Sequence, residues 1–226
     1  YTTDNVSMLH AIINTLHMAF LSLLISVPLG VFGGVYLAEY AKPDSKLVKA
    51  VRITSETLAG LPSIIYGLFG SLFFVNALRW GYSLLSGAFT LAIMVLPIIL
   101  RQTEESLLSV PRSYREGSLA LGAGKLRTTM RIVLPVAMPG ILAAVLLSIG
   151  RIVGETAALI YTSGIVAAIC VSPMASGRTL AVHLYQLQQE GLNIDEAFAV
   201  AAVLLVVVII MNAVSTKAAK RFSTKD

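Results

Sequence analysis

Five long apolar runs, separated by short polar and charged stretches, dominate the pattern of this sequence. They extend over residues 11–37, 58–78, 84–101, 136–160 and 197–216. A helix of about 20 apolar residues crosses the hydrocarbon core of a bilayer, where only helices and closed barrels satisfy the backbone. The runs lack the alternation of apolar and polar residues that barrel strands require. The pattern therefore predicts an all-α membrane protein, a polytopic helical bundle with five spans in this chain.

The composition supports this class of protein. Hydrophobic residues make up 56% of the chain and charged residues 13%, and the mean hydropathy is +0.81. Soluble domains are about 45–50% apolar and about 25% charged. The length of 226 residues suits one bundle, so we expect a single transmembrane domain over residues 1–226. Cys170, the single cysteine, excludes an internal disulfide and a thiolate metal cluster, and we expect it to be a small packing residue.

The basic residues predict the orientation of the chain in the membrane. Thirteen of them lie in the first connection, in the third connection and after the last run, whereas the other connections hold only Arg79 and Arg178. Positive residues gather on the cytoplasmic side. We therefore expect the first connection, the third connection and the tail 217–226 to be cytoplasmic, with no basic patch of the kind that binds nucleic acid. The thirteen are Lys42, Lys46, Lys49, Arg52, Arg112, Arg115, Lys125, Arg127, Arg131, Lys217, Lys220, Arg221 and Lys225.

The same rule places the start of the chain outside. Because the chain opens at Tyr1 with no signal peptide, an outside start predicts one further upstream span, and six in the intact protein. An external loop is expected at about 161–195. Within it, 163–175 is apolar but too short to cross, which predicts a re-entrant or packed segment. Leu180, Leu184 and Leu187 then recur at helical spacing, which predicts a short amphipathic helix on the outer membrane surface.

The third connection, at about 110–135, carries its own apolar stripe. Leu119, Ala123, Leu126 and Met130 recur at the spacing of one helical face, although no span lies here. Periodicity alone leaves two hypotheses open: a helix resting on the bilayer surface, or a helix presented to a cytoplasmic partner through its apolar side chains. The small residues that surround the stripe favour the second, because they permit close backbone approach. These are Gly117, Ser118, Gly122 and Gly124.

The spacing in this connection resembles a motif of ABC importer permeases. In that family a Glu-Ala-Ala start is followed by a glycine and later by Ile-x-Leu-Pro, and this chain has Glu116, Gly122, Ile132, Leu134 and Pro135 at the matching positions. It departs by having Gly117-Ser118 in place of two alanines. The resemblance implies a coupling helix that sits in a cleft of an ATPase subunit. The implied coupling residues are Glu116, Gly117, Ser118, Gly122, Ala123, Ile132, Leu134 and Pro135.

Longer stretches are similar to the inorganic-phosphate permeases of the PstA type. They are LPSIIYGLFG at 61–70, LPIILRQTEESLLSVP at 96–111, GRIVGETAALIYTSG at 150–164 and SGRTLAVHLYQLQQEG at 176–191. The resemblance implies the type I importer permease fold and a multi-pass subunit in a bacterial or archaeal cytoplasmic membrane. It implies ATP-driven translocation of inorganic phosphate. The implied partners are a second permease of the PstC type as heterodimer, two cytoplasmic ATPase subunits, an external phosphate-binding protein and membrane lipid.

Two arginines lie where charge is costly. Arg151 lies deep in the fourth run, where insertion of a charge costs at least about 2.5–3.5 kcal/mol, and Glu155 follows one helical turn later. The two could form a self-neutralising structural pair, or Arg151 could line the path of an anion, since its planar fork suits phosphate. Arg101, at the end of the third run, could be an interfacial anchor. The resemblance favours a place on the translocation path for Arg151 and Arg101, with Glu155 as a gating or pairing partner.

Several chemistries have no support in the sequence. Gly124-Lys125 lacks the earlier glycine and the following Ser or Thr of a P-loop, so we expect ATP to be hydrolysed by partner subunits. His10, His17 and His183 show no metal-ligand spacing, and we expect ordinary interfacial histidines. No nucleophile–base pair is visible. We therefore predict a transport subunit that is not itself an enzyme and has no cofactor or metal.

Two other functions remain open on the sequence. An importer permease for another oxyanion, such as phosphonate, sulfate or molybdate, would use the same arginine chemistry. An ion-gradient transporter or channel is a more distant alternative, because such proteins show paired broken helices in two related halves. The chain has neither a second copy of the third connection nor a convincing internal repeat.

Overall fold

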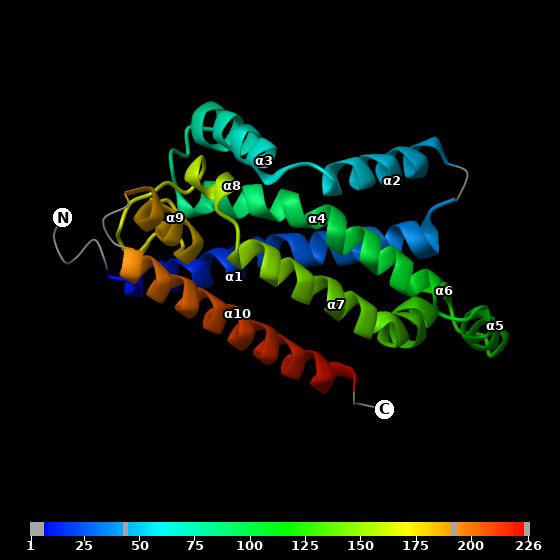
Figure 1. The fold of residues 1–226 in the computed structure, drawn as a ribbon. Coiled ribbons are helices and arrows are strands. Elements are labelled where there is room, and N and C mark those ends of the chain that lie inside the picture. The colour runs from blue at the N-terminus through cyan, green and yellow to red at the C-terminus, as the bar shows by residue number, and fades with distance from the viewer. Residues whose placement is uncertain (1–6, 43–44, 191–193, 224–226) are drawn as a thin grey trace. The chain divides into compact units, whose positions relative to one another are not determined.

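The computed structural model describes residues 7–42, 45–190 and 194–223, and within these ranges the secondary structure is helical, with no strand (Figure 1). The all-α prediction is confirmed. Three elements are π turns, labelled η. The elements in chain order are α1 (Leu9–Val35), η2 (Tyr36–Tyr40), α2 (Lys46–Ala59), α3 (Ser63–Gly70), η3 (Ser71–Ala77), α4 (Leu84–Leu108), α5 (Arg112–Ala120), α6 (Lys125–Thr128), η4 (Thr129–Val133), α7 (Leu134–Val153), α8 (Ala157–Ile160), α9 (Leu180–Glu190) and α10 (Ile194–Ser223).

Four described helices are long and apolar enough to cross a membrane: Leu9–Tyr40, Leu84–Leu108, Lys125–Val153 and Ile194–Lys217. A fifth is counted if α2 and α3–η3 together form one broken span. The second apolar run, 58–78, is not one continuous helix: α2 ends at Ala59, and α3 begins at Ser63 and continues into η3 as far as Ala77. Pro62 disfavours helical backbone at the residue before it, which explains the break. The predicted tail 217–226 begins inside α10 and ends beyond the described residues.

The chain divides into two compact units, each assembled from separated segments. The first comprises the described residues of Tyr1–Ile25, Leu61–Val95 and Ile149–Asn212, and the second those of Ser26–Gly60, Leu96–Ser148 and Ala213–Asp226. The long helices α1, α4, α7 and α10 each contribute residues to both units.

The core of the first unit brings α9 against the beginnings of α1 and α10. Leu180 and Leu187 of α9 pack with Ala11 of α1 and with Ala197 and Val200 of α10, and all five are buried. Figure 1 shows α9 beside the first turns of α10. The leucines at 180, 184 and 187 therefore share a face, as predicted, but that face packs on protein. The position of this helix at the outer membrane surface stays a prediction.

A buried amide holds the segment 163–175 and the residues after it in the first unit. Asn14 of α1 is fully buried, and its Nδ2 donates to the carbonyl oxygens of Ala168 and Arg178, at 2.9 and 3.2 Å. Its Oδ1 accepts the backbone N–H of Cys170 at 2.9 Å. Buried polar groups are stabilising when all their partners are present. The apolar segment 163–175 is thus packed against α1, which agrees with one of the two alternatives left by its length.

A glycine pair forms a close helix crossing in the second unit. A Cβ added at Gly30 would lie 2.7 Å from Cγ2 of Ile99, and one at Gly34 would lie 2.6 Å from Cβ of Thr103. The Gly30-x-x-x-Gly34 pattern therefore permits α1 to pack on α4 within this chain. The second glycine pair differs, because a Cβ at Gly150 would meet no atom within 4 Å.

The core of the second unit joins the end of α1 to the end of α4 and the start of α7. Its buried members come from these helix ends, from the residues just after α4 and from η4. They are Val35, Leu107, Val110, Val133, Ala137 and Ile141, with Val31, Ala38 and Leu134 packed against them. The third connection leaves and re-enters the membrane helices beside this cluster, since Val110 precedes α5 and Val133 ends η4.

Candidate functional site

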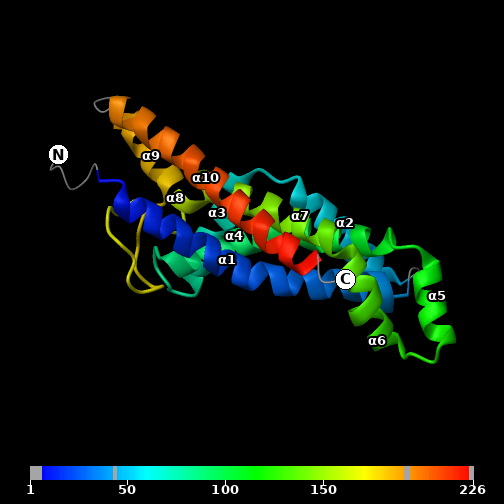
Figure 2. The same cartoon turned by 90° about the horizontal axis from the view of Figure 1, so that it is seen from below.

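The third connection folds into a helical hairpin of α5 and α6, which Figure 2 shows as two short green helices joined by a turn. The prediction of one helical stripe over Leu119, Ala123, Leu126 and Met130 was wrong, because α5 ends at Ala120 and α6 begins at Lys125. The apolar residues of the hairpin are nevertheless strongly exposed: Leu121 is 91%, Leu126 63% and Leu119 50% exposed. This surface is suited to a partner protein.

Gly122 ends α5 through a Schellman motif. The N–H of Gly122 donates to the carbonyl of Leu119 at 2.9 Å, and the N–H of Ala123 donates to that of Ser118 at 3.2 Å. The motif requires a left-handed residue at its centre, and Gly122 has φ +82°. The glycine of the sequence motif therefore has a physical reason, which is the sharp turn between the two helices.

Ser118 joins the two helices of the hairpin through a buried hydrogen bond. Its hydroxyl lies 2.8 Å from Oγ1 of Thr128 on α6, and both residues are buried. The alanine usual at this position in the resembled motif could not make this hydrogen bond. Gly117, by contrast, is exposed, and a Cβ there would meet no atom within 4 Å. Of the two departures from the motif, the serine thus has a structural role in this chain.

The last motif residues lie within a membrane-length helix. Ile132 belongs to η4, whereas Leu134 and Pro135 begin α7, inside the continuous helical stretch Lys125–Val153. In η4 the N–H of Leu134 donates to Thr129, five residues back. Such a widened turn accommodates a proline, which has no N–H to donate. The exposed Glu116 lies on α5, and Ala123 lies in the turn that follows it.

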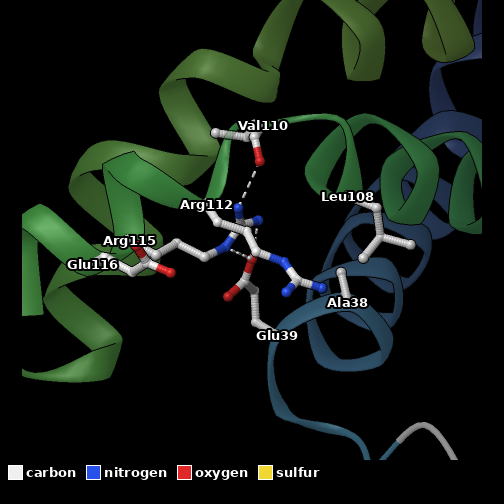
Figure 3. Close-up of a pocket in the computed structure, with 7 residues that line it drawn as sticks. All are labelled: Ala38, Glu39, Leu108, Val110, Arg112, Arg115 and Glu116. Atoms are coloured by element: carbon white, nitrogen blue, oxygen red, sulfur yellow. Dashed lines mark hydrogen bonds and ion pairs between the residues drawn. The ribbon is translucent and has the colours of Figure 1, made fainter.

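Arg115 anchors the hairpin to the end of the first helix, a role that the charge pattern did not reveal. Its Nη2 and Nε donate to Oε1 of Glu39 in η2, at 2.6 and 3.0 Å. Its Nη2 and Nη1 also donate to the carbonyls of Leu107 and Val110, at 2.7 and 2.8 Å. Figure 3 shows the guanidinium between Val110 and Glu39, while that of Arg112 extends toward Ala38 and Leu108. The sequence signal was Glu39 itself, a carboxylate at the end of an apolar run.

Arg101 lies within α4, two turns before its end, and is surrounded by carboxylates. Its Nε donates to Glu105 at 2.8 Å, and its Nη1 lies 3.3 Å from Glu56 of α2. Beside it, Arg52 donates to the buried Glu104 at 2.8 Å. These residues line a cavity of about 280 Å³. The three carboxylates exceed the two arginines in charge, so this cavity as it stands would repel an anion.

Arg151 has different surroundings in the first unit. It is half-buried near the end of α7, and no described carboxylate lies within ion-pair distance of it. The possible pair with Glu155 is not formed, because α7 ends at Val153 and Oε1 of Glu155 accepts the N–H of Ala158 at 3.0 Å. The self-neutralising pair is thereby excluded for this conformation. The Arg151 charge lies within electrostatic range of Tyr66 in α3.

Comparisons with known proteins agree with this architecture. A family model for the binding-protein-dependent transport system inner membrane component matches residues 30–224. The probable ABC transporter permease protein YqgI of Bacillus subtilis is 39% identical over an alignment of 216 residues that covers 88% of this chain and 73% of that protein. The phosphate transport system permease protein PstA 1 of Mycobacterium tuberculosis is 41% identical over 69% of this chain and 50% of its own length.

A solved structure shares the fold. An inward-facing MetNI methionine ABC transporter chain is 21% identical, covers 95% of this chain and 94% of its own length, and has a TM-score of 0.70. The chain belongs to the family of binding-protein-dependent transport system inner membrane components. It is therefore a multi-pass membrane permease of the ABC importer class, a transport subunit and not an enzyme. It spans about half the length of the phosphate permeases that it matches.

Proposed function

We propose that the chain is the part of a phosphate importer permease that carries inorganic phosphate across the cytoplasmic membrane. Support comes from relatives named phosphate transport system permease proteins, at about 40% identity over 69% of this chain. The observation that carries the proposal on the structural side is Arg151, half-buried in an apolar helix without a carboxylate partner among the described residues. A charge in such a place is costly unless a substrate or water meets it.

The hairpin of α5 and α6 is the proposed contact with the ATPase subunits. Its apolar side chains, above all Leu121 at 91% exposure, would fill a cleft of the partner, and Glu116 and Gly117 lie on the same short helix. Closure of the ATPases on ATP would draw the hairpins of two permeases together, and hydrolysis would release them. The proposed partners are a second permease of the PstC type, two ATPase subunits and an external phosphate-binding protein, with the C-terminus in the cytoplasm.

The two arginines would act at different stages. Arg151 is available to an anion as it stands, because no described carboxylate neutralises it. Arg101 is held by Glu56 and Glu105, so it could meet phosphate only after these ion pairs open. Glu155 supports the backbone of α8 through Ala158 and would position this region rather than bind the anion.

The test is transport by the assembled complex in proteoliposomes. Phosphate, sulfate, molybdate and a phosphonate are supplied one at a time with their binding proteins, and ATP-dependent uptake and ATP hydrolysis are measured. We expect phosphate alone to raise both. Stimulation by another oxyanion in place of phosphate would reassign the substrate, and uptake driven by an ion gradient without ATP would refute the importer.

A further inference from the structure

We propose that η2, the last turn of the first membrane helix, is where motion of the α5–α6 hairpin enters the membrane helices. Glu39 and Tyr40 are the two points of attachment, and Arg115 is the positioning residue. The inference rests on the proposed function, since it names how the ATPase contact is joined to the permease. All the residues involved belong to the second unit.

The first attachment uses all three nitrogens of the Arg115 guanidinium. Two of them converge on one carboxylate oxygen of Glu39, and two donate to the carbonyls of Leu107 and Val110 at the end of α4. Leu107 belongs to the last turn of α4, and Val110 follows the end of that helix. One side chain of α5 therefore ties the hairpin to η2 and to α4 at once.

Burial makes this attachment stiff. The Glu39 side chain is 8% exposed and that of Arg115 is 21% exposed. Charge-assisted hydrogen bonds are short and strong, and removal of one partner leaves a buried charge without compensation. The hairpin cannot shift relative to η2 without breaking these contacts or carrying η2 along.

The second attachment comes from the other helix of the hairpin. Nζ of Lys125, the first residue of α6, lies 5.1 Å from the ring centroid of Tyr40. This distance suits a cation–π interaction. Glu39 and Tyr40 are neighbours in η2, so α5 and α6 are attached to the same turn by two independent contacts.

The turn that receives both contacts is packed on its other side. The buried cluster of Val35, Leu107, Val110, Val133 and Ile141 joins the helix before η2 to α4 and α7, and Ala38 of η2 packs against it. Close-packed interiors transmit displacement with little compression. A pull on the hairpin would therefore move η2 together with the adjoining ends of α4 and α7.

The experiment separates ATPase docking from transmission. The full complex is purified with Glu39→Gln, with the charge exchange Glu39→Arg plus Arg115→Glu, or with Arg112→Gln as the matched control. Arg112 is an exposed arginine on the same helix, and its side chain makes no hydrogen bond or ion pair with a described residue. Retention of the ATPase, ATP hydrolysis and phosphate uptake are measured on each complex.

We expect Glu39→Gln to retain the ATPase and to hydrolyse ATP, while phosphate uptake per ATP falls by about fivefold or more, the lower range of coupling between two sites. Charge exchange should recover part of the loss, and Arg112→Gln should match the unaltered protein. An unchanged uptake per ATP in Glu39→Gln would overturn the proposal.

A second variant, Lys125→Gln, tests the proposal if the complex with Glu39→Gln does not assemble. Lys125→Gln removes the attachment of α6 without burying a charge, and it should also lower uptake per ATP. A normal ratio in that variant would overturn the proposal. Failure of the proposed function is distinct, because the unaltered complex would then show no ATP-driven phosphate uptake at all.

Discussion

Replacement of Gly122 tests whether the turn between α5 and α6 sets the affinity for the ATPase. Gly122 has φ +82°, and a Cβ there would meet no atom within 4 Å, so the cost of Gly122→Ala is conformational and not steric. Placing an L-residue in the left-handed region costs about 1–2 kcal/mol. If the Schellman turn is the form that docks, affinity should fall by about 5- to 30-fold.

Gly117 supplies the matched control for this experiment. It lies in the same helix, a Cβ there also meets no atom within 4 Å, and its φ is not positive. Gly117→Ala should stabilise α5 by about 0.5–1 kcal/mol, so ATPase affinity should hold or rise. The ATPase affinity of Gly122→Asn should lie between those of Gly117→Ala and Gly122→Ala, because asparagine tolerates the left-handed backbone conformation.

The assay is titration of the purified ATPase subunit onto the permease complex in nanodiscs, with ATP-dependent uptake in parallel. Wild-type affinity in Gly122→Ala would refute the role of the turn. A loss in Gly117→Ala as large as that in Gly122→Ala would show that any added methyl group blocks docking, and the conformational reasoning would then fail.

Three further predictions follow from the described contacts. Arg151→Gln should lower phosphate uptake by about 10- to 100-fold in proteoliposomes, because a charged hydrogen-bond partner contributes about 1.5–3 kcal/mol; unchanged uptake removes Arg151 from the path. Gly34→Ala should lower the thermal midpoint of the detergent-purified protein through overpacking of about 1–3 kcal/mol, since its Cβ would lie 2.6 Å from that of Thr103. Gly150→Ala, with no atom within 4 Å of the added Cβ, should keep or raise the midpoint, and equal losses in the two variants would contradict the crossing. Burial raises the pKa of the Cys170 thiol. Its rate of alkylation should therefore be low at pH 7 and should increase only at a higher pH than that of a free cysteine peptide. Equal pH profiles of the two alkylation rates would exclude this burial.

The glycine patterns show how far sequence reasoning extends in this chain. Gly30-x-x-x-Gly34 and Gly150-x-x-x-Gly154 are equivalent as patterns, and each could be a contact between subunits. Only the first forms a close crossing with another helix of the same chain. The difference depends on which helix lies opposite, and spacing along one helix contains no information about its neighbour.

The partners of the charged residues at the candidate site also could not be inferred from spacing along the sequence. Arg151 and Glu155 are four residues apart, which places them together on a continuous helix. The helix ends at Val153, so the carboxylate caps α8 and the pair is not formed. Arg101 was equally uncertain from sequence, and its partners Glu56 and Glu105 come from two helices. A contact with Glu56, 45 residues away, cannot be inferred from local periodicity.

The sequence by itself determined the class of this protein. A bilayer requires about 20 apolar residues for each helix and excludes open strands, so hydropathy alone predicted a helical membrane protein. The spacing from Glu116 to Pro135 predicted the importer family through its resemblance to a known motif, whereas the sharp turn at Gly122 is seen only in the structure. Only the tertiary structure decided the attachment of Arg115 to Glu39, which are 76 residues apart. Such contacts arise when packing brings distant segments together, and burial then makes a surface-type charge pair into a stiff connection.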